Sequence, residues 1–147
     1  MLYNFIIVLI SLSLICVVVT DIYRRSIYNW TVLVIFLMSL GLAVLRGDAL
    51  CCLLVAVGLV PVLYVLWRCH LFGGGDVKLM IGLVPVVPVA GLLSLFLSIA
   101  VAGSIVAGAC LAWRWIKLVT GRGDIGDQTV PYGVAIAAGT FINLYHF

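Results

Sequence analysis

Apolar stretches long enough to cross a lipid bilayer recur along most of this 147-residue chain. Hydrophobic residues make up 66% of the sequence and charged residues 9%, and the mean hydropathy is +1.37. A soluble domain is about half apolar and about a quarter charged. Because so few charges cannot cover a water-facing surface, the sequence predicts an integral membrane protein.

A membrane-spanning helix needs about 20 mainly apolar residues. The tract over residues 77–113 is too long for one crossing and is interrupted by Pro85, Pro88 and Gly91, so we divide it into two. The fourth span is short, and we expect neighbouring helices to shield it from lipid. We predict one all-α domain over residues 1–147 with about six spans, over residues 3–20, 30–45, 49–67, 77–87, 91–113 and 130–145.

The distribution of basic residues predicts the orientation. No basic residue precedes the first span, whereas Arg24 and Arg25 follow it, which favours a retained span over a signal peptide. Three connections on one side of the six spans hold seven basic residues, and the other side holds only Arg46. The seven are Arg24, Arg25, Arg68, Lys78, Arg114, Lys117 and Arg122. The positive-inside rule makes that side cytoplasmic and places both termini on the outer side.

The composition argues against several other classes. The basic residues are spread over loops and form no dense patch, so we do not expect a nucleic-acid partner. The five cysteines form no Cys-x-x-Cys pair, which argues against a zinc or thioredoxin-like site and favours packing roles. We therefore predict neither a metal nor a cofactor.

Two aspartates far apart in sequence fall at the same predicted membrane depth. Asp21 lies where the first span ends, and Asp76 lies where the fourth begins. Carboxylates in a membrane are costly and usually face a cavity or a partner. Two close carboxyl groups share a proton near neutral pH, because both cannot ionise easily. The charged member can activate a water and the protonated member can donate to a carbonyl, which is general acid–base hydrolysis of a peptide bond.

Three glycines, Gly73 to Gly75, precede the second aspartate. They permit positive φ and close backbone approach, so they could shape a loop that meets an extended substrate. Lys78 could pair with an acid or face the lipid headgroups. A plainer interpretation stays open: Asp76 could be the N-cap of the next helix after an ordinary turn, and Asp21 the polar end of the first helix.

Three motifs resemble those of the type IV prepilin peptidase family. "GGGDVKL" at residues 73–79 resembles its Gly-x-Gly-Asp signature, and "DIYRRSIYN" at residues 21–29 resembles its first aspartate with the following basic stretch and Ile-Pro-Asn. "VPYGVAIAAG" at residues 130–139 resembles the start of its last helix. The resemblance implies a six-span aspartic endopeptidase of the inner membrane, which removes a short basic leader from prepilins. It implies Asp21 and Asp76 as the catalytic pair, facing the cytoplasm, and Gly73 and Gly75 as residues that shape the loop.

The chain departs from the family pattern in two places. Tyr28 stands where the Ile-Pro-Asn motif has proline, which puts the local geometry in doubt. The larger family members carry a cytoplasmic insertion with two Cys-x-x-Cys pairs and also methylate the new N-terminus, but this chain has neither the insertion nor the pairs. It resembles the compact, peptidase-only form of tight-adherence pilus systems.

Two other functions are compatible with parts of this pattern. Presenilin-type intramembrane proteases share Gly-x-Gly-Asp, but they carry a Tyr-Asp pair and a late Pro-Ala-Leu, whereas this chain has Thr20 before Asp21 and Pro131-Tyr132-Gly133. A small carrier or an assembly subunit of a secretion system is the non-enzymatic alternative. An inverted repeat would favour a carrier, and the sequence has no convincing one.

Overall fold

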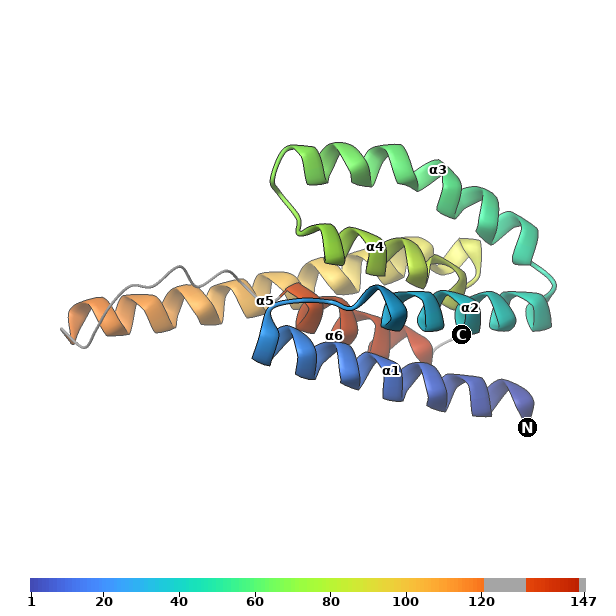
Figure 1. The fold of residues 1–147 in the computed structure, drawn as a ribbon, viewed down its shortest axis with the longest axis horizontal. Helices are drawn as coiled ribbons and strands as arrows, with labels where there is room; N and C mark the ends of the chain where they lie inside the picture. The colour runs from blue at the N-terminus through green and yellow to red at the C-terminus, as the bar shows by residue number, and fades with distance from the viewer. Residues whose placement is uncertain (121–131, 146–147) are drawn as a thin grey trace.

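The structure is a computed structural model that describes residues 1–120 and 132–145, and within these ranges the regular elements are all helical. Figure 1 shows a bundle of roughly aligned helices in which α5 projects well beyond the others. The elements are α1 (Leu2–Arg24), α2 (Asn29–Arg46), α3 (Ala49–Arg68), α4 (Gly74–Leu83), η1 (Val84–Val86), η2 (Val89–Gly91), α5 (Leu92–Val119) and α6 (Tyr132–Leu144).

All six apolar segments predicted from the sequence contain a helix. Four helical stretches are long and apolar enough to cross a membrane: α1, α2, α3 and residues Val89–Val119. Their lipid-facing character is visible on α5, where large apolar side chains such as Leu93 and Ile105 are about 70% exposed. Helix α4 has 10 residues and α6 has 13, so a crossing by each of these two remains a prediction.

Two of the boundaries that differ from the predicted ones change where charged residues lie. Helix α1 continues to Arg24, so Asp21 lies in its last turn rather than in a loop. Helix α5 continues to Val119, six residues beyond the predicted end at Trp113. The basic residues Arg114 and Lys117 therefore lie on a helix, because isolated charges do not end a helix at a membrane surface as Pro or Gly would. Arg122 and the start of the sixth predicted span at Val130 lie outside the described residues.

Helix α4 is short because the sequence after it cannot continue an α-helix. Pro85 and Pro88 follow closely, and the chain changes to the 3-10 turns η1 and η2. The guanidinium of Arg46, at the end of α2, donates hydrogen bonds of 2.7 Å to the carbonyl oxygens of both Pro85 and Val86. Arg46 also pairs with Asp48 at 3.3 Å. These bonds satisfy backbone carbonyls that a broken helix would otherwise leave unpaired.

The α1–α2 and α3–α4 connections lie at one end of the bundle, as Figure 1 shows, and the start of α1 and the end of α6 lie at the other. Arg24, Arg25, Arg68 and Lys78 are at the first end, and Arg46 is at the second. The structure thus reproduces the predicted segregation of charge for these residues. Which end faces the cytoplasm remains a prediction.

Helix α6 packs tightly between α1 and α5. A Cβ atom on Gly139 would lie 2.5 Å from the backbone nitrogen of Ile99 on α5, so the two helices approach this closely only because residue 139 is glycine. Nearby, the buried Asn143 amide donates to Ser98 at 2.6 Å, and its oxygen accepts from Ser94 at 2.8 Å. Such interhelical bonds between polar side chains reinforce packing inside a membrane.

Candidate active site

Asp21 is a buried acid on the last turn of α1. The residue is 7% exposed, and Arg25, the C-cap of the helix, adopts a left-handed conformation with φ 52°. The Asp21 Oδ2 atom is fully buried and has no hydrogen-bond partner among the described residues. An unsatisfied buried carboxylate oxygen is expensive and is typical of a functional site.

Asp76 lies in the first turn of α4. The N-cap of this helix is Gly73, so Asp76 is the third helical residue and the interpretation of Asp76 as the N-cap is wrong. Its carboxylate instead accepts a hydrogen bond from the backbone N–H of Gly73. This is half of a capping box, in which an acid at the third position reaches back to the N-cap amide. The position also benefits from the positive end of the helix dipole.

The three glycines allow close approach, and the expected positive φ is not found. Gly73 has φ −67°, and Gly47 is the one positive-φ glycine in the described ranges. A Cβ on Gly73 would lie 2.7 Å from Asp76 Oδ2, and one on Gly75 would lie 3.1 Å from the Ile27 side chain. The remaining glycine of the three similarly lies against a tryptophan of α3. The glycines thus leave room for an acid, for the α1–α2 connection and for α3.

The two acids open into one pocket of about 520 Å³ at the end of the bundle where both connections lie. Its walls come from the ends of α1 and α3, the α3–α4 turn, the start of α4 and the start of α6. The lining residues are Asp21, Arg25, Trp67, His70, Leu71, Phe72, Gly73, Gly74, Asp76 and Tyr132. The structure therefore brings together two carboxyl groups that are 55 positions apart in the sequence.

Asp76 lies outside the four candidate spans, and its pKa is raised to about 6. Burial is the largest cause, because it disfavours the charged carboxylate, and the charge of Asp21 adds to it. The hydrogen bond from the Gly73 amide acts in the opposite direction, since it stabilises the ionised form. Asp76 can therefore carry a proton close to neutral pH.

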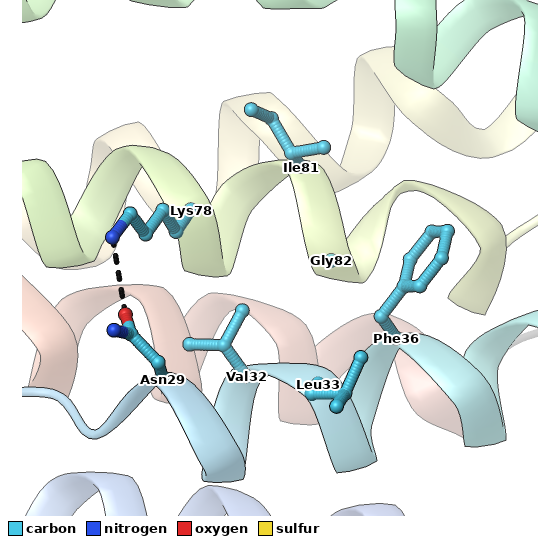
Figure 2. A pocket seen from close by; sticks show the side chains of 7 residues that line it. All are labelled: Asn29, Val32, Leu33, Phe36, Lys78, Ile81 and Gly82. Atoms are coloured by element: carbon cyan, nitrogen blue, oxygen red, sulfur yellow. Dashed lines mark hydrogen bonds between the residues drawn. The ribbon is translucent and has the colours of Figure 1, made fainter.

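Lys78 faces away from the acids. Its ammonium donates a 3.1 Å hydrogen bond to the side-chain oxygen of Asn29 on α2, as Figure 2 shows. The two side chains stand at one end of an open groove of about 400 Å³ between α2 and α4, which is otherwise apolar. Lys78 does not line the acid pocket. The local geometry favours a role in joining α4 to α2.

Tyr28 occupies the position of the missing proline and keeps the backbone angle that proline would impose. Its φ is −72°, close to the value of about −65° at which a proline ring is fixed. As the N-cap of α2, it also accepts a 2.7 Å hydrogen bond from Arg24 through its hydroxyl group. The α1–α2 connection is therefore held by a side-chain bond, and the loss of the proline does not distort it.

Among the site residues that were not predicted from the sequence, two lie at the start of α6. Gly133 packs directly on the first acid: a Cβ there would lie 2.8 Å from Asp21 Oδ2. Tyr132 lines the pocket and makes an edge-on contact with Phe72, with ring centroids 5.6 Å apart. Both lie in the third motif, residues 130–139, and this motif was the sequence feature from which they could have been predicted. Residues 130 and 131 of the motif are outside the described ranges.

The fold and pocket define a helical membrane protein with a pair of carboxyl groups at one end of its bundle. The chain belongs to the type IV leader peptidase family, whose sequence pattern matches it over residues 7–110. The matched region contains both acids and all of the glycine-rich turn. The chain is therefore a peptidase by family. No curated protein and no solved structure matches it significantly.

Replacing Gly133 by alanine should slow peptide cleavage without unfolding the protein. The added methyl group would overlap the Asp21 carboxylate, so the acid must move, and a shift of about 1 Å in a reacting group can cost about 10²-fold in rate. We expect a fall of about 10- to 100-fold in kcat. Gly41→Ala is the matched control, because its methyl group meets one side-chain atom at an ordinary 3.8 Å. Equal rates for the two variants would show that Gly133 does not position the acid.

Proposed function

We propose that the chain is a prepilin leader peptidase, in which Asp21 and Asp76 together activate a water to cleave one peptide bond. The observation that supports this most strongly is the shared pocket of the two acids. Family membership supports the peptidase chemistry, and the compact sequence without Cys-x-x-Cys pairs favours cleavage without methylation.

In the proposed mechanism the two carboxyl groups have different roles. Asp76, with its raised pKa, is the protonated member and donates to the carbonyl oxygen of the scissile bond. Asp21, which lines the same pocket, is the proposed base and accepts a proton from the attacking water. The tetrahedral intermediate then collapses as Asp21 passes its proton to the leaving nitrogen and Asp76 takes a proton back from the hydroxyl group, which restores both acids. Each role needs the other acid, because neither group alone can both donate and accept at the start of the reaction.

The proposed substrate enters from the cytoplasm. Positive-inside orientation of the described basic residues would place the pocket at the cytoplasmic face of the inner membrane. The short basic leader would then lie on the aqueous side of the scissile bond, and the apolar helix of the prepilin would lie in the bilayer. Gly73 and Gly75 would shape the turn that carries Asp76.

Co-expression with a candidate prepilin tests this function. We expect a shift of the prepilin to higher mobility and an N-terminal sequence that begins just before its apolar helix. A cut inside the apolar helix would instead support the presenilin-type alternative. Absence of any cut, across prepilins that an active family member processes, would favour the carrier or assembly-subunit alternative.

The rate of cleavage should fall as the pH rises above about 6. A raised pKa means that Asp76 gains its proton below pH 6 and loses it above, so the donor form is depleted by about tenfold per pH unit on the alkaline side. The other charged or titratable side chains that line the pocket are Asp21, Arg25, His70 and Tyr132. Initial rates in proteoliposomes between about pH 5 and pH 9 check this. A rate that rises steadily from pH 6 upwards would reverse the assigned roles.

A further inference from the structure

An apolar groove of about 510 Å³ begins where the acid pocket ends. Its walls are α3 on one side and α5 with α6 on the other, because α3 packs on α4 and η1 and diverges from α5. Phe72 and Tyr132 line both the groove and the acid pocket. These two aromatic side chains, in edge-on contact, thus form the boundary between a polar compartment and an apolar one.

The α5 wall of the groove begins with Phe96 and Ile99 and continues with small residues along the helix. Ala100 and Ser104 are exposed there, and the spacing of the small residues repeats every three or four positions. The Ser104 hydroxyl bonds to its own helix at the carbonyl of Ala100, so the wall is apolar in character. The small residues are Ala100, Gly103, Ser104 and Ala107. Such a face lets a second helix approach closely within a membrane.

The opposite wall is formed by large apolar side chains of α3, and Met80 of α4 also contributes to the groove. Leu59, Leu63 and Leu66 lie on one face of α3, at positions separated by four and three residues. A groove with leucines on one wall and a run of small residues on the other suits the close approach of an apolar helix. A peptide in this environment must satisfy its own backbone hydrogen bonds, so a helical segment is the form that the bilayer permits.

We infer that this groove binds the first turns of the substrate's apolar helix, immediately after the scissile bond, and that Phe72 and Tyr132 set where the helix starts. The inference rests on the proposed function. A chain whose peptide bond lies between Asp21 and Asp76 extends in two directions, and one of them meets this groove. The bond must be extended to be cut, whereas the segment in the groove must be helical. The aromatic pair lies where the substrate changes from extended to helical. It therefore favours cleavage of a peptide bond close to the beginning of an apolar segment.

Filling the groove tests the inference. Ala107→Phe places a large ring in the groove, and Ala109→Phe places the same ring on a part of α5 that does not line it. Each variant is assayed in proteoliposomes on two substrates: a full prepilin, and a short peptide that ends soon after the scissile bond and lacks the apolar helix. The quantity measured is the ratio of kcat/KM for the long substrate to that for the short one, which partial unfolding does not change.

We expect Ala107→Phe to lower this ratio at least about tenfold and Ala109→Phe to leave it at the wild-type value. If Ala107→Phe left this ratio of kcat/KM values unchanged, the inference would be overturned, and lipid chains would be the remaining occupants of the groove. As a second measurement, a photoreactive residue in the first turn of the prepilin helix should crosslink to α3 or α5 at the groove; crosslinks confined to other helices would also overturn it. Cleavage of neither substrate by the wild-type protein would refute the proposed function itself, so the two failures are distinguishable.

Discussion

Asp21→Asn and Asp76→Asn are each expected to lower the rate of leader removal by on the order of 10³-fold, while the protein still inserts in the membrane. Asparagine has the shape of aspartate but cannot exchange a proton with the substrate or with water. General acid–base catalysis by a positioned side chain contributes about 10²- to 10⁴-fold. Because the proposed chemistry requires a donor and an acceptor at once, the double variant should be no slower than the slower single variant.

The matched control for this experiment is Asp48→Asn. Asp48 lies at the opposite end of the bundle, where it pairs with Arg46 and does not line the acid pocket. We expect this variant to cleave at the wild-type rate, measured as initial velocity on a purified prepilin in vesicles. Full activity in either Asp21→Asn or Asp76→Asn would exclude a mechanism that needs both acids.

Gly139→Ala is expected to destabilise the protein more than any other single methyl addition at a described glycine. The new Cβ would lie 2.5 Å from the backbone nitrogen and 2.6 Å from the Cα of Ile99, and a backbone cannot rotate away as a side chain can. Overpacking of this kind costs about 1 to 3 kcal/mol or more. Alanine gains about 1 kcal/mol over glycine in helix propensity, which does not offset a displaced helix.

Separation of α6 from α5 would also move Gly133 away from Asp21, since both glycines lie on α6. The thermal unfolding midpoint in detergent and the amount of protein in the membrane should therefore fall together with activity. Gly108→Ala is the control, because nothing lies within 4 Å of its new methyl group. A midpoint for Gly139→Ala equal to that of Gly108→Ala would contradict the observed packing of α6 on α5.

Hydrophobic tracts and their interruptions were sufficient to predict the six helical segments. The proline-rich break after α4 was a particularly clear signal, because proline both ends a helix and fixes its own backbone angle. The end of α5 was not predicted, since Arg114 and Lys117 indicate a membrane surface but do not stop a helix. The short length of α4 was part of the same prediction, because Pro85 and Pro88 follow it closely.

The charged residues of the candidate site could be predicted from the sequence. The contacts of its glycines, which need space where a side chain would stand, could not. Asp21 and Asp76 are conspicuous because acids are rare in a chain of this composition. Gly133 lies in the third motif, but the motif does not indicate what the glycine contacts, and this becomes visible only when α6 lies against α1. The alternative prediction that Asp76 is the N-cap of α4 was wrong, because the N-cap is Gly73. In a run of three glycines, the sequence does not indicate which residue begins the helix.

The most direct test of the paired-acid mechanism measures whether the two acid positions face each other in the membrane. Asp21→Cys and Asp76→Cys would be combined in a chain whose native cysteines are replaced by serine; these are Cys16, Cys51, Cys52, Cys69 and Cys110. With a short bifunctional thiol reagent, we predict an intramolecular crosslink for this pair and none for Asp48→Cys with Asp76→Cys. If the two introduced thiols each react with a water-soluble maleimide but are not crosslinked to one another, the two positions do not share a pocket, and the mechanism is wrong.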